Sequence, residues 1–186
     1  MKKTVFILLA TLAVSCAHVA EGAAMRRMIY MVLLVGIALT GCTKRPTASE
    51  IMVGSALPAF CVVTNDGQTV GSQDFDNGLG LIVFFHTACP DCQRELPIVQ
   101  SLFERYSSSM RFLAIGRNQN RGDVERYWQE NGLTIPCSAQ EDAAVFRLFA
   151  AHTVPRSYLI HDGVVISQWA DDPIMTEQDF TSFIHL

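Results

Sequence analysis

The fold is decided by residues 79–92, which read LGLIVFFHTACPDC. The run from Leu79 to Phe85 is continuously apolar, which is typical of a strand buried on both faces of a sheet. Two cysteines, Cys89 and Cys92, follow after a short loop, where a helical pattern begins. The stretch therefore predicts a strand, a Cys-x-x-Cys turn and a helix in direct succession.

On either side, short apolar segments alternate with helical ones, which predicts an α/β layer fold. Hairpins are expected over residues 60–70 and 157–169, because each contains an Asp-Gly pair that supplies the positive φ of a tight turn. The expected order is a hairpin, then βαβαβα, then ββα. The other elements are helices at 90–107, 123–130, 142–151 and 177–184, the last with Thr176 as N-cap, and strands at 112–116 and 133–137.

The Cys89 and Cys92 pair has the spacing that thiol–disulfide exchange requires. One thiolate must attack a disulfide, and a second thiol must be close enough to resolve the mixed disulfide. Three residues apart on the first helical turn, the two sulfurs share one face, and the helix N-terminus stabilises a thiolate on Cys89. Cys92, further into the helix, suits the resolving role.

The pair has two competing interpretations. Half of a zinc site would need a second Cys or His pair, and the remaining cysteines of the expected domain, Cys61 and Cys137, are isolated in sequence. A purely structural bridge would close almost no loop and would add little stability. We therefore expect no metal and no cofactor.

Val154-Pro155 comes just before the strand expected at 157–160, where a proline in mid-sheet would be out of place. A cis bond before Pro155 would bring its backbone beside the dithiol and present an edge to a substrate peptide. Taken alone, a loop proline is more often only a turn residue. Its position 63 residues after Cys92 favours the functional interpretation.

Three further side chains are weaker candidates. His86, three residues before Cys89, could act as a base or metal ligand, although a histidine at a strand end is more often simply hydrogen-bonded there. Cys61 and Cys137 fall on expected strands, so we expect them to be buried, reduced and dispensable for catalysis. A bridge between them is the alternative that an oxidising compartment allows.

The N-terminus carries two signal-like segments in tandem, at residues 1–16 and 25–42. The second has a cationic start, a run of about 7–15 apolar residues and small residues before the cut, which together define a secretory signal. Its last residues, Leu-Thr-Gly-Cys42, resemble a bacterial lipobox, in which the cysteine becomes the lipidated first residue. Cleavage at Cys16 is the competing interpretation. A transmembrane helix would need roughly 20 apolar residues, and the run has only about a dozen.

These features divide the chain into a signal region at 1–41, a lipidated tether at 42–52 and one domain at 53–186. Met25 opens a complete signal by itself, so we expect it to be the true start. The residues after Cys42 show no acidic sorting signal, which places the protein on the periplasmic side of a bacterial membrane, anchored by lipid. The expected mature chain keeps ten basic and seventeen acidic residues, a net charge near −7, and has no basic cluster. Nucleic-acid binding is therefore not expected.

From about Val53 to Leu186 the sequence resembles the extracytoplasmic thioredoxin-like disulfide reductases of the TlpA/ResA group. This resemblance implies a thioredoxin fold, with a central mixed sheet flanked by helices and an added N-terminal β-hairpin. The matching pieces are Val53-Gly54-x-x-Leu57-Pro58-x-Phe60, Asp66-Gly67, Ile82-Val83-Phe84-Phe85 leading into Cys89-x-x-Cys92, Glu95-Leu96-Pro97, Val154-Pro155 and Asp162-Gly163.

The resemblance also implies roles for individual residues. Cys89 would be the attacking thiolate, Cys92 the resolving thiol, and Pro155 cis. Glu95 would lie near the dithiol and tune its proton transfer, whereas without the resemblance it would be an ordinary exposed helix carboxylate. The sequence departs from the group at Ala88, often Trp, and at Arg156, often Thr, and both positions are expected to line the substrate groove.

The function expected from all this is that of a membrane-anchored disulfide reductase acting on disulfide-containing proteins and recharged by a membrane thiol donor. Between the cysteines lie Pro90, which has no N–H donor, and Asp91, whose charge disfavours a thiolate on Cys89, so the pair should be reducing. The alternatives are a dithiol oxidase of the same fold and a non-enzymatic metal chaperone. A peroxiredoxin-type peroxidase would carry Thr or Ser at position 86 and Pro at 82, where this chain has His86 and Ile82.

Overall fold

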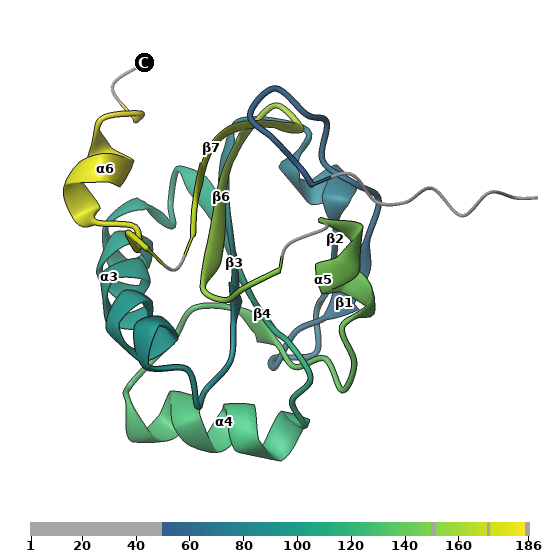
Figure 1. The fold of residues 1–186 in the computed structure, drawn as a ribbon, viewed down its shortest axis with the longest axis vertical. Coiled ribbons are helices and arrows are strands. Elements are labelled where there is room, and N and C mark those ends of the chain that lie inside the picture. Colours follow the sequence, from purple (N-terminus) through teal and green to yellow (C-terminus); the bar gives the residue numbers. More distant parts are fainter. Residues whose placement is uncertain (1–49, 150–151, 171, 185–186) are drawn as a thin grey trace, which may run out of the picture. The chain divides into compact units, whose positions relative to one another are not determined.

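The computed structural model describes residues 50–149, 152–170 and 172–184, and their elements follow the expected order (Figure 1). The signal region, Cys42 and most of the tether lie outside these residues. The elements are β1 (Cys61–Val63), β2 (Thr69–Gly71), the 3-10 helix η2 (Ser72–Phe75), β3 (Leu79–Phe85), α3 (Pro90–Tyr106), β4 (Met110–Gly116), α4 (Arg121–Glu130), β5 (Cys137–Ser138), α5 (Ala144–Leu148), β6 (Arg156–His161), β7 (Val164–Trp169) and α6 (Glu177–Thr181).

The apolar strand β3 is the middle strand of a five-stranded mixed sheet, in the order β5-β4-β3-β6-β7. It pairs in parallel with β4 and antiparallel with β6, and β4 pairs in parallel with β5. The hairpin of β1 and β2 forms a separate two-stranded antiparallel sheet. The five-stranded sheet is the predicted central mixed sheet flanked by helices, and the separate two-stranded sheet is the predicted N-terminal hairpin.

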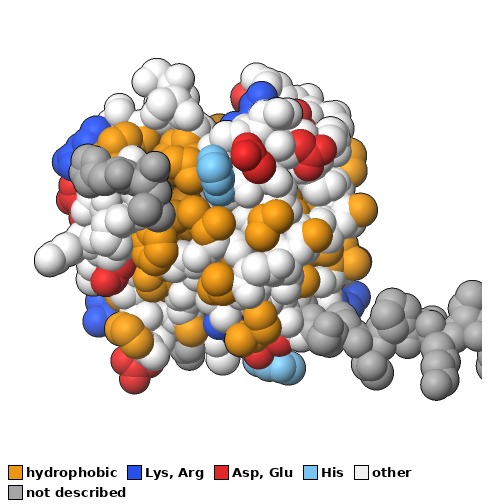
Figure 2. Space-filling model, turned by 90° about the horizontal axis from the view of Figure 1, so that it is seen from above, with side chains coloured by type: hydrophobic (Ala, Val, Ile, Leu, Met, Phe, Trp, Pro, Cys, Tyr) orange, Lys and Arg blue, Asp and Glu red, His pale blue; other side chains and the backbone are white. Residues whose placement is uncertain are grey.

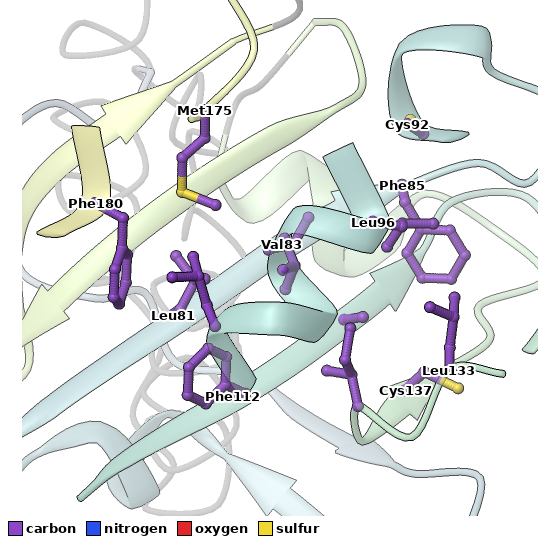
Figure 3. Close-up of a cluster of buried hydrophobic side chains, with 14 of the residues drawn as sticks. Leu81, Val83, Phe85, Cys92, Leu96, Phe112, Leu133, Cys137, Met175 and Phe180 are labelled. Carbon is purple, nitrogen blue, oxygen red and sulfur yellow. The ribbon is translucent and has the colours of Figure 1, made fainter. Parts of the chain in front are cut away.

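Alternate side chains of β3 build two cores, one on each face of the sheet. Leu81, Val83 and Phe85 pack with residues of α3, α4 and α6, and Figure 3 shows Leu96 of α3 beside Phe85. Ile82 and Phe84 belong to the second core, with residues of α5 and the β1–β2 region. In Figure 1, α3 and α6 accordingly lie on one side of the sheet and α5 with β1 and β2 on the other.

Both predicted hairpins form, and their turns show the expected backbone. At the β6–β7 turn, Asp162 has φ +51° and Gly163 has φ +75°, and at the β1–β2 turn Gly67 has φ +82°. Positive φ strains residues with a Cβ, which favours glycine at 67 and 163, while aspartate is one of the few other residues that tolerate it, as Asp162 does. The Asp-Gly pairs in the sequence were therefore reliable markers of the turns.

The strand expected over 133–137 is the clearest difference in secondary structure, because β5 begins only at Cys137. Pro136 still accepts a hydrogen bond from Ala114 of β4, but the backbone of Ile135 is held by side chains instead of a neighbouring strand. Gln100 of α3 accepts a hydrogen bond from the Ile135 N–H at 3.3 Å, and the Trp128 indole donates to the Ile135 carbonyl at 2.9 Å. These contacts satisfy buried backbone groups that a strand ladder would otherwise satisfy.

Two helices are shorter than expected. α5 covers 144–148 of the expected 142–151, and α6 covers 177–181 of the expected 177–184. Thr176 caps α6 as predicted, accepting a hydrogen bond from the Asp179 N–H at 3.1 Å. Apolar spacing marked the helices but not their ends, because the chain on either side of each helix is also partly buried.

The prediction that Cys61 is buried is wrong. β1 alternates between exposed and buried side chains, with Val62 directed inward at 4% exposure and Cys61 exposed. Cys137 is buried at 1% exposure, as predicted, and burial raises the pKa of its thiol to about 12. An apolar strand sequence indicated β1 but did not tell which of its two faces carries the core.

Charged side chains are thinly spread over the face shown in Figure 2. Apolar side chains gather over part of it, and the arginine side chains visible there are scattered. Among the described residues, none of the helices is both long enough and apolar enough to span a bilayer.

Candidate active site

The dithiol lies at the carboxyl end of β3, where the chain turns from the central strand into α3. Cys89 is the N-cap of α3, and Pro90 follows at the first helical position, where proline's fixed φ and missing N–H suit a helix start. The loop between strand and helix is tight, since the Cys89 N–H donates to the His86 carbonyl at 3.0 Å. The cysteine is thereby held at the positive end of the helix.

The Cys89 sulfur is half-buried and has two polar neighbours. It accepts a hydrogen bond from the Cys92 N–H at 3.4 Å, within the usual limit for sulfur, and its thiol donates to the Val154 carbonyl at 3.3 Å. A helix N-terminus with partial exposure is the kind of surrounding in which reactive cysteines are found. The arrangement leaves Cys89 accessible to a disulfide from outside.

Cys92 is fully buried, one turn further along α3, and carries a free thiol as Cys89 does. Burial, reinforced by the neighbouring Cys89 sulfur and by the negative charge of Glu95, raises the pKa of the Cys92 thiol well above its ordinary value. Figure 3 shows Cys92 at the edge of the apolar core and apart from Cys137. Because its pKa is raised, the Cys92 thiol needs a nearby proton acceptor before its sulfur can attack a disulfide.

Glu95 is buried at 1% exposure, on the same face of α3 as Cys92. Its Oε1 accepts a hydrogen bond from the Ser157 hydroxyl, and its Oε2 has no partner among the described residues. Burial raises the pKa of Glu95 to about 7, against the lowering effect of the Ser157 hydroxyl and of the Met175 backbone. The interpretation as an ordinary exposed carboxylate is wrong.

The Val154–Pro155 peptide bond is cis, as predicted, and lies beside the dithiol through the contact between the Val154 carbonyl and Cys89. Arg156 does not line this region as expected. It pairs in register with Phe84, so its side chain lies on the opposite face of the sheet from Ser157, and it forms an ion pair with Glu50.

The other candidates lie close by but have structural partners. His86 accepts a hydrogen bond from the Ala88 N–H through Nδ1 at 3.1 Å, the ordinary interpretation of a histidine at a strand end. Asp91 pairs with Arg94 on the surface of α3. His86 and Ala88 line a groove of about 400 Å³ between the loop and α4. Within the described part of the chain, no group of three or more His, Cys, Asp or Glu residues could hold a metal.

Sequence reasoning missed two residues of this site. Gln119 is buried, and its Oε1 accepts hydrogen bonds from the Thr87 N–H at 2.8 Å and the Thr87 hydroxyl at 2.7 Å, which holds the loop before Cys89. Ser157 contacts Glu95 across 62 residues of sequence. Strand alternation two residues after Pro155 could have indicated which face Ser157 takes, whereas nothing local marked Gln119.

Comparison with known proteins agrees with this geometry. The chain is 28% identical over 147 residues to thiol-disulfide oxidoreductase ResA of Geobacillus kaustophilus, covering 77% of this chain and 84% of that protein. It is 28% identical over 129 residues to sporulation thiol-disulfide oxidoreductase A of Bacillus subtilis, covering 66% and 77%.

Solved structures match the fold. StoA from Bacillus subtilis superposes with a TM-score of 0.59 at 23% identity, covering 70% of this chain and 99% of that one. A putative thioredoxin from Neisseria meningitidis gives a TM-score of 0.63 at 24% identity, covering 72% and 89%. The sheet order and these neighbours establish the predicted thioredoxin fold. The sequence profile of the AhpC/TSA family matches residues 53–168. The chain is therefore a thiol–disulfide oxidoreductase and belongs to the AhpC/TSA family.

Proposed function

We propose that the chain is a membrane-anchored disulfide reductase that donates electrons from Cys89 and Cys92 to disulfide-containing proteins. The observation that carries the proposal is the asymmetry of the pair. Cys89 is partly exposed at a helix N-terminus beside the Val154 carbonyl, while Cys92 is fully buried behind it next to a buried carboxyl group. Attack from outside and resolution from inside are thereby divided between two sulfurs.

The proposed reaction consists of two successive thiol–disulfide exchange steps. The Cys89 thiolate attacks one sulfur of the substrate disulfide, and the other substrate sulfur leaves with the electron pair as a thiolate. Cys92 then loses its proton and attacks the Cys89 sulfur, which forms the Cys89–Cys92 disulfide and releases the second substrate thiolate. The substrate gains two electrons, and the chain must afterwards be reduced by a thiol donor.

Glu95 is the group placed to take the proton from Cys92. It is one turn from Cys92 on the same helical face, and its pKa near 7 lets it accept a proton at neutral pH and release it again. Burial gives the carboxyl this intermediate proton affinity. A carboxylate in water would bind the proton too weakly to serve at the same pH.

Changing the cysteines separates their roles. Cys89→Ser should abolish insulin reduction, whereas Cys92→Ser should keep the first attack and accumulate mixed disulfides that non-reducing gels and mass spectrometry detect. Cys61→Ser and Cys137→Ala are the matched controls and should retain activity, because neither sulfur lies at the dithiol. Full activity of Cys89→Ser, or loss of activity in both controls, would contradict the assignment.

Replacing Glu95 by Gln tests the carboxyl in two ways. The resolving step at pH 7 should slow by about 100-fold, the lower end of what a general base contributes, and its pH dependence near 7 should disappear. The folded pKa, about 7, lies above the ordinary 4.5, so wild-type stability falls as pH rises through this window.

Glu95→Gln should therefore be more stable than wild type at pH 8, by on the order of 3 kcal/mol, and this gain should vanish below about pH 4.5. Urea unfolding at the two pH values measures it. A variant that is equally destabilised at both would show that the carboxyl is not buried with a raised proton affinity.

The direction of transfer depends on how strongly the Cys89 thiolate is stabilised. No cationic side chain lies between the cysteines, which favours a reductase over an oxidase. Asp91 opposes the thiolate, but its ion pair with Arg94, both side chains being more than a third exposed, weakens this influence. The buried negative charge of Glu95, which lies nearer to Cys92 than to Cys89, also disfavours a thiolate on Cys89.

Equilibration with glutathione buffers should give a potential well below that of the strong oxidants. A value around −120 mV would instead support the oxidase. Asp91→His should raise the reduction potential, making the pair more oxidising. The substitution replaces a negative side chain by one that can carry a positive charge, which would stabilise the Cys89 thiolate. Arg94→Gln is the matched variant and should move the potential the opposite way, since it removes the partner of Asp91. If the potential is unchanged in both variants, the electrostatic argument is wrong.

The anchor and compartment rest on the N-terminal sequence. A chain lipidated at Cys42 would be held at the periplasmic side of a bacterial membrane, which fits a membrane thiol donor as the recycling partner. Mass spectrometry of the native protein from membranes should find a diacyl or triacyl group on Cys42. Cys42→Ser should release the protein from the membrane fraction, and an unmodified chain beginning elsewhere would refute the anchor.

A further inference from the structure

We infer that Ser157 is a positioning residue that holds the Glu95 carboxyl beside Cys92 and sets the pH at which Glu95 accepts the proton of Cys92. This inference rests on the proposed exchange function and adds a specific residue to it. Its starting point is the hydrogen bond that the Ser157 hydroxyl donates to Glu95 Oε1, between two residues that are each at most 1% exposed.

The position of Ser157 on β6 gives it this access. Ser157 pairs with Val83, whose side chain lies in the core beneath α3, so the Ser157 side chain faces α3 as well. Its neighbours Arg156 and Tyr158 face the opposite side of the sheet. Only the second residue after Pro155 can therefore reach Glu95 from the start of this strand.

The same strand end also contacts the attacking cysteine. Val154, three residues before Ser157, accepts the hydrogen bond of the Cys89 thiol through its carbonyl. One short segment, 154–157, thus contacts Cys89 with its backbone and Glu95 with a side chain. The carboxyl is held to the same structural element that borders the attacking sulfur.

The hydrogen bond matters because the carboxyl has few polar contacts. Oε2 of Glu95 has no hydrogen-bond partner in the described residues, so the Ser157 hydroxyl is the side chain that stabilises the carboxylate. A buried charge without such a partner is strongly disfavoured. Because Ser157 occupies Oε1, the proton can be taken at Oε2 without breaking this contact.

Few other groups act on Glu95. α3 supplies the thiol of Cys92, which interacts with the Glu95 charge, and the segment before α6 supplies the Met175 backbone, which favours the charged carboxylate. From β6 comes only the Ser157 hydroxyl, and no charged side chain in the described part of the chain shifts the pKa of Glu95. Ser157 is therefore the side chain whose removal should change Glu95 most.

The step itself is a proton transfer coupled to sulfur attack. The S–H bond of Cys92 breaks, its proton moves to Glu95 Oε2, and the electron pair stays on the Cys92 sulfur. That sulfur bonds to Cys89, and the substrate sulfur leaves Cys89 with the electron pair of the broken bond. Ser157 takes no part in these bond changes and acts only through the carboxyl.

The first test measures Glu95 directly. Carboxyl carbon NMR of ¹³C-glutamate-labelled protein, with Glu95→Gln identifying the resonance, gives the titration midpoint. Ser157→Ala should raise this midpoint by about one to two pH units, the effect of losing a hydrogen bond to a charged group. Ser157→Thr keeps the hydroxyl and should stay near the wild-type midpoint. Ser167→Ala, a buried serine on the same face of neighbouring β7, should change nothing.

The second test measures the resolving step. Its rate-against-pH midpoint in Ser157→Ala should rise by the same amount, and Ser157→Thr should restore it. In a Glu95→Gln background, Ser157→Ala should have no further effect on the pH profile, since the two residues act as one unit.

An unmoved NMR midpoint in Ser157→Ala overturns the inference while insulin reduction by wild type still supports the exchange function. If Ser157→Ala shifts the NMR midpoint of Glu95 but not the pH midpoint of the resolving step, Glu95 does not accept the proton of Cys92, and the inference is overturned. If Ser157→Thr behaves like Ser157→Ala in both measurements, the hydroxyl is not the cause and the inference fails.

Discussion

Burial of β3 on both faces is the constraint on which the rest of the structure depends. Its apolar side chains alternate between two cores, so helices must cover one side of the sheet and α5 with the N-terminal hairpin the other. The strand can therefore present reactive groups only at its end. There the chain turns into α3, which places Cys89 at a helix N-terminus and Cys92 inside the core beneath it.

The site consists of polar groups held inside an apolar interior. Cys92 and Glu95 are both deeply buried, and burial raises the pKa of each. The pKa of the Glu95 carboxyl is raised to about 7, so this group can exchange a proton near neutral pH. The hydrogen bond from the Ser157 hydroxyl limits how far this pKa rises. The proposed proton transfer from Cys92 to Glu95 therefore depends on the packing around α3 and β6.

Local sequence signals predicted the elements well wherever chemistry within a few residues decides the structure. The apolar run of β3 and the Asp-Gly turns fall where they were expected. Prediction failed where distant side chains intervene. The backbone before β5 is held by Gln100, which comes from a different element, and so it does not form the expected strand. Cys61 is exposed because the face that β1 turns to the core depends on how the hairpin docks.

The sequence by itself determined the Cys-x-x-Cys pair, the proline before β6 and the order of elements, because each depends on residues adjacent along the chain. Only the tertiary structure decided the state of Glu95, the partner of Arg156 and the part played by Ser157. An isolated glutamate on a helix titrates like any carboxyl in water. Glu95 differs because α3 packs against β6, a strand some sixty residues later in the chain. This packing excludes water from the carboxyl and places the Ser157 hydroxyl against it.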